Sequence, residues 1–317
     1  MSAQEQRPIG TGFDASSDVV DVLDGVDLTG KTALVTGGSS GLGAESVKAL
    51  AAAGARVIAP VRRPGSAPTA EEVEEVSGLD LGDLDTVARA AEHIAEITSN
   101  VNIVITAAGV MATPLRRVGP GWEGQLAVNH LGHFALLARL YPLLAAQGAR
   151  VVTYSSSAHH ASGIRWDDPH FLRGYDKWKA YGQSKTATSL FAVGLDARGR
   201  GDGVRAFTVH PGKILTGLQR DVPHAEQVAM GWVDEQGKFI GEGFKTWSQG
   251  AATGLWAATA GELEGQGGLF LEDCDVAAVL ESGGAMTGGV EPYAVDHAGA
   301  EKLWRISAAI TATDLPG

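Results

Sequence analysis

The chain has 317 residues, of which 44% are hydrophobic and 20% are charged, a composition typical of a globular protein that can bury a large core. Its net charge of −12 is opposite in sign to that of a nucleic-acid-binding surface, so we predict no nucleic-acid partner. The single cysteine, Cys274, excludes an internal disulfide and a cysteine-rich zinc site.

The sequence contains no segment that we interpret as a signal peptide or a membrane span. Residues 1–13 are polar, and no run of 18 apolar residues occurs. We therefore expect a protein without membrane attachment, and the lone cysteine favours the reducing cytoplasm.

Residues 1–28 form a predicted N-terminal extension ahead of a single domain at 29–317. The extension is mostly polar, and only residues 19–23 form a short apolar run. An arm that packs on a neighbouring subunit and a floppy leader are both compatible with this composition.

A glycine turn between a strand and a helix opens the domain. Residues 32–36 predict a strand and residues 44–53 a helix, and the turn between them carries Gly37, Gly41 and Gly43. Such a turn lets the backbone approach a pyrophosphate at the helix N-terminus. No lysine follows the last glycine, so the turn is not an ATP-type P-loop. We predict a dinucleotide site, with a turn that only reverses the chain as the alternative.

The end of the second predicted strand, residues 54–61, indicates which dinucleotide is bound. Val61 stands where an acidic residue would bind the ribose hydroxyls of NAD, and Arg62 and Arg63 follow it. An arginine at this place accommodates a 2′-phosphate, so we predict NADP(H) rather than NAD(H). A solvated strand end is the alternative.

The next elements extend the predicted sheet. A third strand at 74–81 ends in Asp80 and Leu81, which are expected to border the adenine; a helix follows at 83–97 and a fourth strand at 101–106. A long helix is predicted over 121–147, with Pro142 bending or ending it near its last turns.

A fifth strand at 150–154 runs into three serines, residues 155–157. Ligands lie beyond the carboxyl ends of strands in an open parallel sheet, so a catalytic hydroxyl is expected here. Residues 158–180 read as a loop-rich insert whose histidine spacings match no metal-binding pattern, and we predict no metal site.

Tyr181 and Lys185 are four residues apart at the start of a predicted helix, so they share one face. A nearby cation favours the ionised form of a phenol, and Lys185 is therefore expected to lower the pKa of Tyr181 and make it a proton-transfer group. A solvated helix face explains the same pair when it is taken alone.

The remaining elements complete an α/β fold. We expect a sixth strand at 204–209, a segment at 217–246 that covers a pocket, a helix at 247–259, a strand at 268–271 and a helix at 295–309. Together they predict a Rossmann-type, doubly wound parallel sheet of about seven strands with helices on both faces.

Taken together, these motifs resemble the short-chain dehydrogenase/reductase family, and within it the retinol dehydrogenase-like branch. The resemblance covers residues 28–310 and lies in the stretches Thr36-Gly37-Gly38-Ser39-Ser40-Gly41-Leu42-Gly43, Asn129-His130-Leu131-Gly132-His133-Phe134, Ser155-Ser156-Ser157-Ala158-His159, Tyr181-Gly182-Gln183-Ser184-Lys185 and His210-Pro211-Gly212.

The resemblance implies four catalytic roles. Tyr181 would be the general acid for ketone reduction and the general base for alcohol oxidation. Ser156 would polarise the carbonyl oxygen, with Ser155 as the neighbouring candidate. Lys185 would hold the nicotinamide ribose and lower the pKa of Tyr181, and Asn129 would support a water-linked proton path.

The cofactor site follows from the glycine turn and the resemblance together. Pro211, Gly212 and Ile214 would line the nicotinamide side, with Thr216 near the carboxamide. The full predicted set is Gly37, Ser39, Ser40, Gly41, Leu42, Gly43, Arg62, Asp80, Leu81, Ala107, Ala108, Gly109, Tyr181, Lys185, Pro211, Gly212, Ile214 and Thr216.

One position departs from the family pattern. Ala107 stands where the family usually has an asparagine, so we expect a side-chain bond that stabilises the central sheet to be missing. The resemblance further implies a homodimer or homotetramer built on the helices that hold Asn129 and Tyr181, with a monomer, as in some relatives of the family, as the alternative.

The predicted function is that of an NADP-dependent oxidoreductase, a ketoreductase or alcohol dehydrogenase, acting on a carbonyl or secondary alcohol. Met111, His159, Trp166 and Trp178, with the segment at 217–246, suggest a roomy pocket with apolar walls and a fairly large apolar substrate. The alternative is a non-catalytic, dinucleotide-binding regulatory protein on the same fold.

Overall fold

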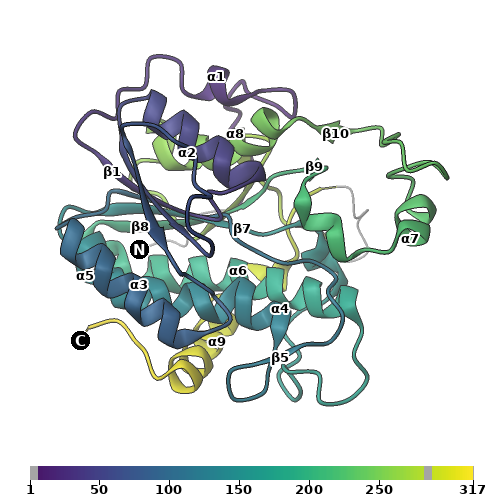
Figure 1. The fold of residues 1–317 in the computed structure, drawn as a ribbon. Coiled ribbons are helices and arrows are strands. Elements are labelled where there is room, and N and C mark those ends of the chain that lie inside the picture. Colours follow the sequence, from purple (N-terminus) through teal and green to yellow (C-terminus); the bar gives the residue numbers. More distant parts are fainter. Residues whose placement is uncertain (1–5, 282–287, 317) are drawn as a thin grey trace.

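An eight-stranded sheet between two layers of helices forms the centre of the computed structural model, which describes residues 6–281 and 288–316 (Figure 1). In spatial order the strands are β12 (Asp275–Val276), β11 (Leu269–Glu272), β8 (Val204–His210), β7 (Ala149–Tyr154), β4 (Ile103–Thr106), β1 (Thr32–Thr36), β2 (Arg56–Val61) and β3 (Val73–Ser77). Seven of them pair in parallel, which confirms the predicted doubly wound sheet, and the two-residue β12 adds an antiparallel edge.

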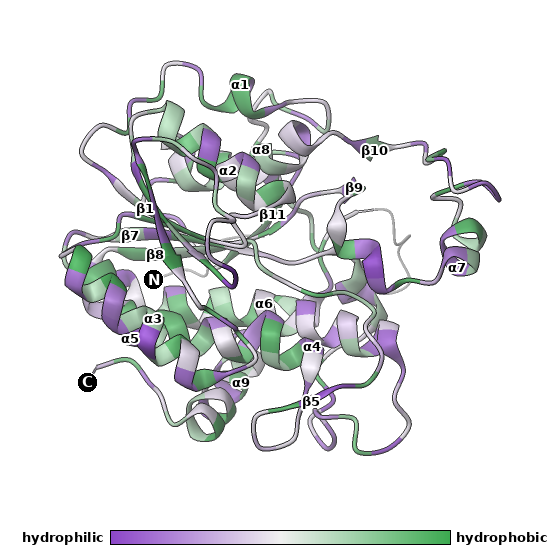
Figure 2. Ribbon diagram, in the orientation of Figure 1, coloured by the Kyte–Doolittle hydropathy of each residue, from purple (hydrophilic) through white to green (hydrophobic). Residues whose placement is uncertain are grey.

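The strand order changes direction between β1 and β4, which creates a crevice beyond their carboxyl ends. Alternate residues of each strand point to opposite faces of the sheet. On β1, Ala33 and Val35 enter one buried core while Leu34 enters the other. Figure 2 shows hydrophobic residues concentrated on these central strands.

Helices cover both faces of the sheet, as predicted (Figure 1). One core lies under α2 (Gly41–Ala52) and α8 (Trp247–Thr259), and the other lies under α3 (Leu84–Ile97), α5 (Gly132–Ala145) and α6 (Lys177–Gly199).

Shorter elements connect these parts. They are α1 (Val19–Val22), β5 (Arg117–Val118), β6 (Trp122–Glu123), α4 (Gly124–Leu126), the π-helical turn η1 (Ala127–Leu131), the 3₁₀ turns η2 (Ser157–Ala161), η3 (Arg200–Asp202), η4 (Gly217–Asp221), η5 (Gly261–Leu263) and η6 (Pro292–Ala294), β9 (Lys213–Ile214), α7 (His224–Ala229) and β10 (Phe244–Lys245).

The described part of the N-terminal extension, residues 6–28, lies against its own chain. The Gln6 side chain pairs with the backbone of Phe270 and donates to the Ala277 carbonyl, and the Asp275 carboxylate accepts from the Ile9 and Gly10 amides. A floppy leader is therefore wrong for these residues. Residues 1–5 of the predicted extension lie outside the described residues, and the boundary at residue 28 stays a prediction.

The C-terminal helix α9 (His297–Thr311) packs on α6 of the same chain. Its Trp304 is stacked on Phe191 of α6 and meets Phe134 of α5 edge to face. This part of the face of α6 is thus covered within the monomer, while the oligomeric state stays a prediction.

The long helix predicted over 121–147 is wrong at its start. Trp122 and Glu123 belong to a β-hairpin, and the Glu123 carboxylate accepts the amides of Gln125 and Leu126 to begin α4. The helix then passes through the π-turn of η1 and continues to Ala145, with Pro142 inside its last turns. Pattern alone missed the hairpin because it has only two residues on each strand.

Three other boundaries differ from the prediction by three residues or more. The strand β3 ends at Ser77 rather than residue 81, because Gly78 has a φ of +93° and the Gly78 and Leu79 amides both donate to the Val61 carbonyl. The helix α2 begins three residues early, at Gly41. The insert predicted over 158–180 ends sooner, because Asp176 caps α6 and this helix begins at Lys177.

We expect Gly132→Ala to destabilise the fold by about 1 to 3 kcal/mol, although alanine is the better helix former. A Cβ at this α5 position would lie 2.2 Å from the carbonyl oxygen of Leu81, in backbone that cannot easily yield. Chemical denaturation measures the loss. The control is Gly201→Ala in η3, where no atom lies within 4 Å of the added Cβ, and equal stabilities for the two variants would contradict the prediction.

Candidate active site

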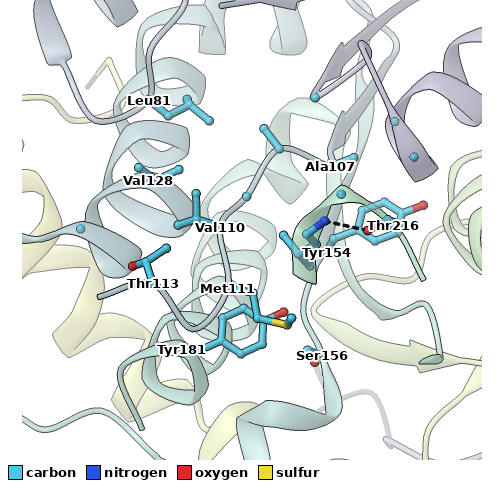
Figure 3. Close-up of a pocket in the computed structure, with 18 of the residues that line it drawn as sticks. Leu81, Ala107, Val110, Met111, Thr113, Val128, Tyr154, Ser156, Tyr181 and Thr216 are labelled. Carbon is cyan, nitrogen blue, oxygen red and sulfur yellow. Dashed lines mark hydrogen bonds between the residues drawn. The ribbon is translucent and has the colours of Figure 1, made fainter. Parts of the chain in front are cut away.

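A cavity of about 1550 Å³ lies at the carboxyl ends of the parallel strands, in the crevice that the strand order predicts. All the residues predicted to bind the cofactor line it, as does Ser156. Asn129 is the predicted site residue that does not line the cavity. In Figure 3, Tyr181, Met111 and Ser156 lie near one another, and Leu81 lies well away from them.

The glycine turn forms one wall of the cavity. Gly37 has a φ of +72°, and a Cβ there would lie 2.6 Å from the Ala108 amide nitrogen, so only glycine fits between the two turns. The helix α2 begins at Gly41, and in the described structure its N-cap residue, Ser40, makes no side-chain capping bond. The first amides of α2 are therefore not capped by a side chain, an arrangement that suits a phosphate.

Two arginines lie beside the glycine turn. Arg62 and Arg63 follow β2, are exposed, and line the cavity, while the preceding Val61 is buried. Within residues 6–281 and 288–316, neither guanidinium makes an ion pair. Positive charge without a protein counter-ion thus lies at the end of β2.

Tyr181 and Ser156 come from α6 and from the turn after β7, and their side chains line the same cavity. Burial raises the pKa of Tyr181 to about 12, and the nearby Ser156 hydroxyl opposes the rise. The prediction of a lowered pKa is therefore wrong for the chain alone, because the loss of water around the phenol is the largest effect. At neutral pH Tyr181 carries its proton.

The structure distinguishes Ser156 from its neighbour Ser155. The Ser155 hydroxyl is buried and donates to the Lys185 carbonyl at 2.9 Å, which fixes α6 to β7. The Ser156 hydroxyl oxygen accepts the Ala158 amide at 3.1 Å and faces the cavity (Figure 3). Its own proton is thus available to a group in the cavity.

Lys185 lies one helical turn after Tyr181 and is 7% exposed. Its Nζ donates to the Tyr154 carbonyl at 2.8 Å and lies 5.6 Å from the centre of the Tyr181 ring. Burial lowers the pKa of Lys185 to about 8, so the ammonium is charged at neutral pH but close to losing its proton.

Asn129 lies in the π-turn η1 and acts behind the cavity wall. Its amide exchanges two 2.9 Å hydrogen bonds with the backbone of Val110, and it donates a third to Ser184. The loop after β4 is thereby fixed to α6. The π-turn itself is a feature often found at functional sites, and the water-linked role of Asn129 stays a prediction.

The part of the cavity beside Tyr181 has apolar walls. Met111, Trp178, Leu218, Val222 and Trp232 form one cluster with the Tyr181 ring, and the last three come from the predicted covering segment. The sequence predicted that this segment covers the pocket but did not indicate which of its residues pack against α6, because that depends on tertiary packing.

Two predicted wall residues lie elsewhere. His159 is fully buried behind Ser156, and Trp166 lies beneath the Lys302 ammonium, outside the cavity. Their positions in a loop-rich insert gave no signal of which side they face. The prediction that they line the pocket is wrong.

Ala107 cannot make the side-chain hydrogen bond of an asparagine, but other hydrogen bonds join the segments beside it. The Thr36 hydroxyl accepts the Ala108 amide at 3.3 Å and pairs with His133 Nε2 at 2.9 Å, and His133 Nδ1 lies 3.2 Å from the Asn129 carbonyl. Strand β1, the turn after β4 and the π-turn are therefore joined through one buried imidazole, which the sequence analysis did not single out.

The described residues contain neither a candidate metal centre nor a candidate membrane-spanning helix. No group of three or more histidine, cysteine or acidic side chains there could hold a metal ion. No helix in the described part of the chain is long and apolar enough to span a membrane. The cytoplasmic location stays a prediction.

Known proteins resemble the chain over most of its length. A family model described as short chain dehydrogenase matches residues 31–227. A Streptomyces lividans protein named "Probable oxidoreductase" is 43% identical over 89% of this chain and 98% of its own. Human "Retinol dehydrogenase 12" is 34% identical over 89% of this chain and 86% of its own. A solved structure from Mycobacterium paratuberculosis, 31% identical, covers 93% of this chain and 98% of that one with a TM-score of 0.69.

Proposed function

Because the chain belongs to the short-chain dehydrogenase/reductase family, in its retinol dehydrogenase-like branch, and is therefore an oxidoreductase, we propose that it reduces a fairly large apolar carbonyl compound with NADPH. The reverse reaction would oxidise the corresponding secondary alcohol. The observation that carries this proposal is the meeting of Ser156, Tyr181 and Lys185 in one cavity with the glycine turn and Arg62.

The residues present fit a nicotinamide dinucleotide. The uncapped start of α2 suits the pyrophosphate, and Asp80 and Leu81, which line the same cavity, would border the adenine. The guanidinium of Arg62, free of a carboxylate partner in the described structure, suits a 2′-phosphate, which favours NADP over NAD. When bound, the cofactor would supply or accept the hydride.

The side chains of the protein would hold the substrate oxygen and move one proton. Ser156 would donate its hydroxyl proton in a hydrogen bond to the carbonyl oxygen, because its own oxygen is already held by the Ala158 amide. Tyr181 would then transfer its proton to that oxygen as the negative charge develops. The raised pKa keeps Tyr181 protonated at neutral pH, the state that reduction requires. The Lys185 ammonium would stabilise the tyrosinate that remains.

The apolar cluster around Tyr181 supports the substrate class. Met111, Trp178 and Trp232 offer large apolar surfaces beside the proposed proton donor, and burial of an apolar substrate body there would provide the binding energy. The non-catalytic alternative has no comparable support, since a regulatory dinucleotide site needs neither a phenol nor a serine at this place.

Titration with NADPH and NADH, followed by nicotinamide fluorescence, tests the cofactor proposal first. We expect Arg62→Ala to weaken NADPH binding roughly tenfold to a hundredfold and to leave NADH binding nearly unchanged, because a charge-assisted bond to phosphate is lost. Arg89→Ala, which removes the same charge from an exposed site outside the cavity, is the control. Equal losses of NADPH and NADH affinity in Arg62→Ala would refute the proposed preference.

A further inference from the structure

His159 lies directly behind the turn that presents Ser156. Its side chain is fully buried and does not line the cavity. The ring nitrogen Nδ1 lies 2.7 Å from the Ser156 carbonyl oxygen, and the His159 backbone amide donates to the same oxygen at 3.1 Å. One residue thus closes the serine turn through two bonds to a single carbonyl.

The partners of the ring define its protonation state. The second nitrogen, Nε2, accepts the Glu291 amide at 3.2 Å, so the ring proton is on Nδ1 and is donated to Ser156. Burial lowers the pKa of His159 to about 3, which keeps the ring neutral in the physiological range. Both nitrogens are occupied, and the ring has no free group for proton transfer.

The far side of the ring is attached to the C-terminal part of the chain. Besides the Glu291 amide, the Tyr293 hydroxyl donates to the His159 carbonyl at 2.7 Å, and the Glu291 carboxylate lies 3.2 Å from Nδ1 of His160. The ring is also held by Phe270 of β11 and by His160, with centroids 4.9 and 4.0 Å away. The imidazole therefore cannot rotate without breaking contacts on three segments.

We propose that His159 is a positioning residue for Ser156. Its neutral ring connects the serine turn to residues 291–293 and to β11, and so fixes the direction in which the Ser156 hydroxyl points. The need for such a support is physical, because the turn follows the last residue of β7, where the sheet no longer constrains the backbone. A displacement of about 1 Å at a reacting group can lower a rate by two orders of magnitude. This inference rests on the proposed function of Ser156.

Two substitutions of His159 separate positioning from general stability. In His159→Asn the side-chain amide can place a donor near the position of Nδ1, whereas in His159→Gln the side chain reaches the position of Nε2 and loses the donor to Ser156. We expect His159→Gln to lower kcat roughly tenfold or more, with KM and Kd for NADPH within about twofold of wild type. His159→Asn should recover most of kcat. Equal kcat values in the two variants, or losses that follow the melting temperature alone, would overturn the inference.

A second measurement does not depend on turnover. Hydrogen exchange of the peptide spanning residues 155–162 should become faster in His159→Gln and stay close to wild type in His159→Asn. Unchanged exchange in both variants would show that the ring does not hold the turn. A wild-type protein that binds neither NADPH nor NADH would refute the proposed function, while the exchange result would still decide whether His159 supports the serine turn.

Discussion

Replacing Tyr181 with phenylalanine should lower kcat for carbonyl reduction by about 10²- to 10⁴-fold, the contribution typical of a positioned general acid. The change removes one oxygen atom from a buried ring and leaves its packing against Met111 and Trp178 in place. The NADPH affinity should stay within a few-fold of wild type. Steady-state kinetics with an apolar ketone, together with the fluorescence titration, measure both quantities.

The pH dependence of the wild-type enzyme offers a check on the same residue. Because the pKa of Tyr181 is raised to about 12, the phenol stays protonated across the neutral range, and reduction should show no loss from Tyr181 ionisation below pH 10. The matched control for Tyr181→Phe is Tyr141→Phe, which removes a hydroxyl that donates to Asp202, away from the cavity. Full activity in Tyr181→Phe would end its assignment as the proton donor.

Replacing Lys185 with methionine should lower kcat/KM roughly a hundredfold at pH 7, because an electrostatic donor near the reacting oxygen is lost. The variant should also change the pH profile. The wild-type ammonium loses its proton as the pH rises through about 8, so wild-type kcat/KM should fall on the alkaline side. In Lys185→Met this alkaline fall should be absent, since no group remains to titrate there.

Thermal unfolding distinguishes the loss of the Lys185 charge from misfolding of the Lys185→Met variant. The folded-state pKa of Lys185 is below its unfolded value, so the buried ammonium opposes folding below pH 8, and this cost is relieved as the pH rises toward 10.5. Methionine removes the cost, and we expect a melting temperature at pH 7 no lower than that of wild type. A variant with low activity and a much lower melting temperature would contradict this account of Lys185.

Local patterns in the sequence were sufficient for most of the fold. The apolar runs of β1, β2, β4, β7 and β8 identified the parallel sheet, because each of these strands is buried on both faces. The helix α8 was predicted at its observed bounds, Trp247–Thr259. The short β5–β6 hairpin and β12 were missed, because strands of two residues give no periodicity.

Local spacing in the sequence is enough to predict which chemical groups lie together on one helix or one turn. The spacing of Tyr181 and Lys185 places them on the same side of α6, and the glycine turn lies between a strand and a helix whatever the rest of the chain does. These are relations within a few residues, fixed by the geometry of the helix and the turn.

The chemical behaviour of those groups depends on tertiary packing. Burial raises the pKa of Tyr181 rather than lowering it, Ser155 is used to hold α6 while Ser156 faces the cavity, and His159 lies behind the wall. The raised pKa depends on removal of water, and the other two outcomes depend on hydrogen bonds between segments that are distant in sequence, such as the bond from Ser155 to α6 and the bond from Glu291 to His159. Desolvation is a property of packing, and no local spacing encodes it.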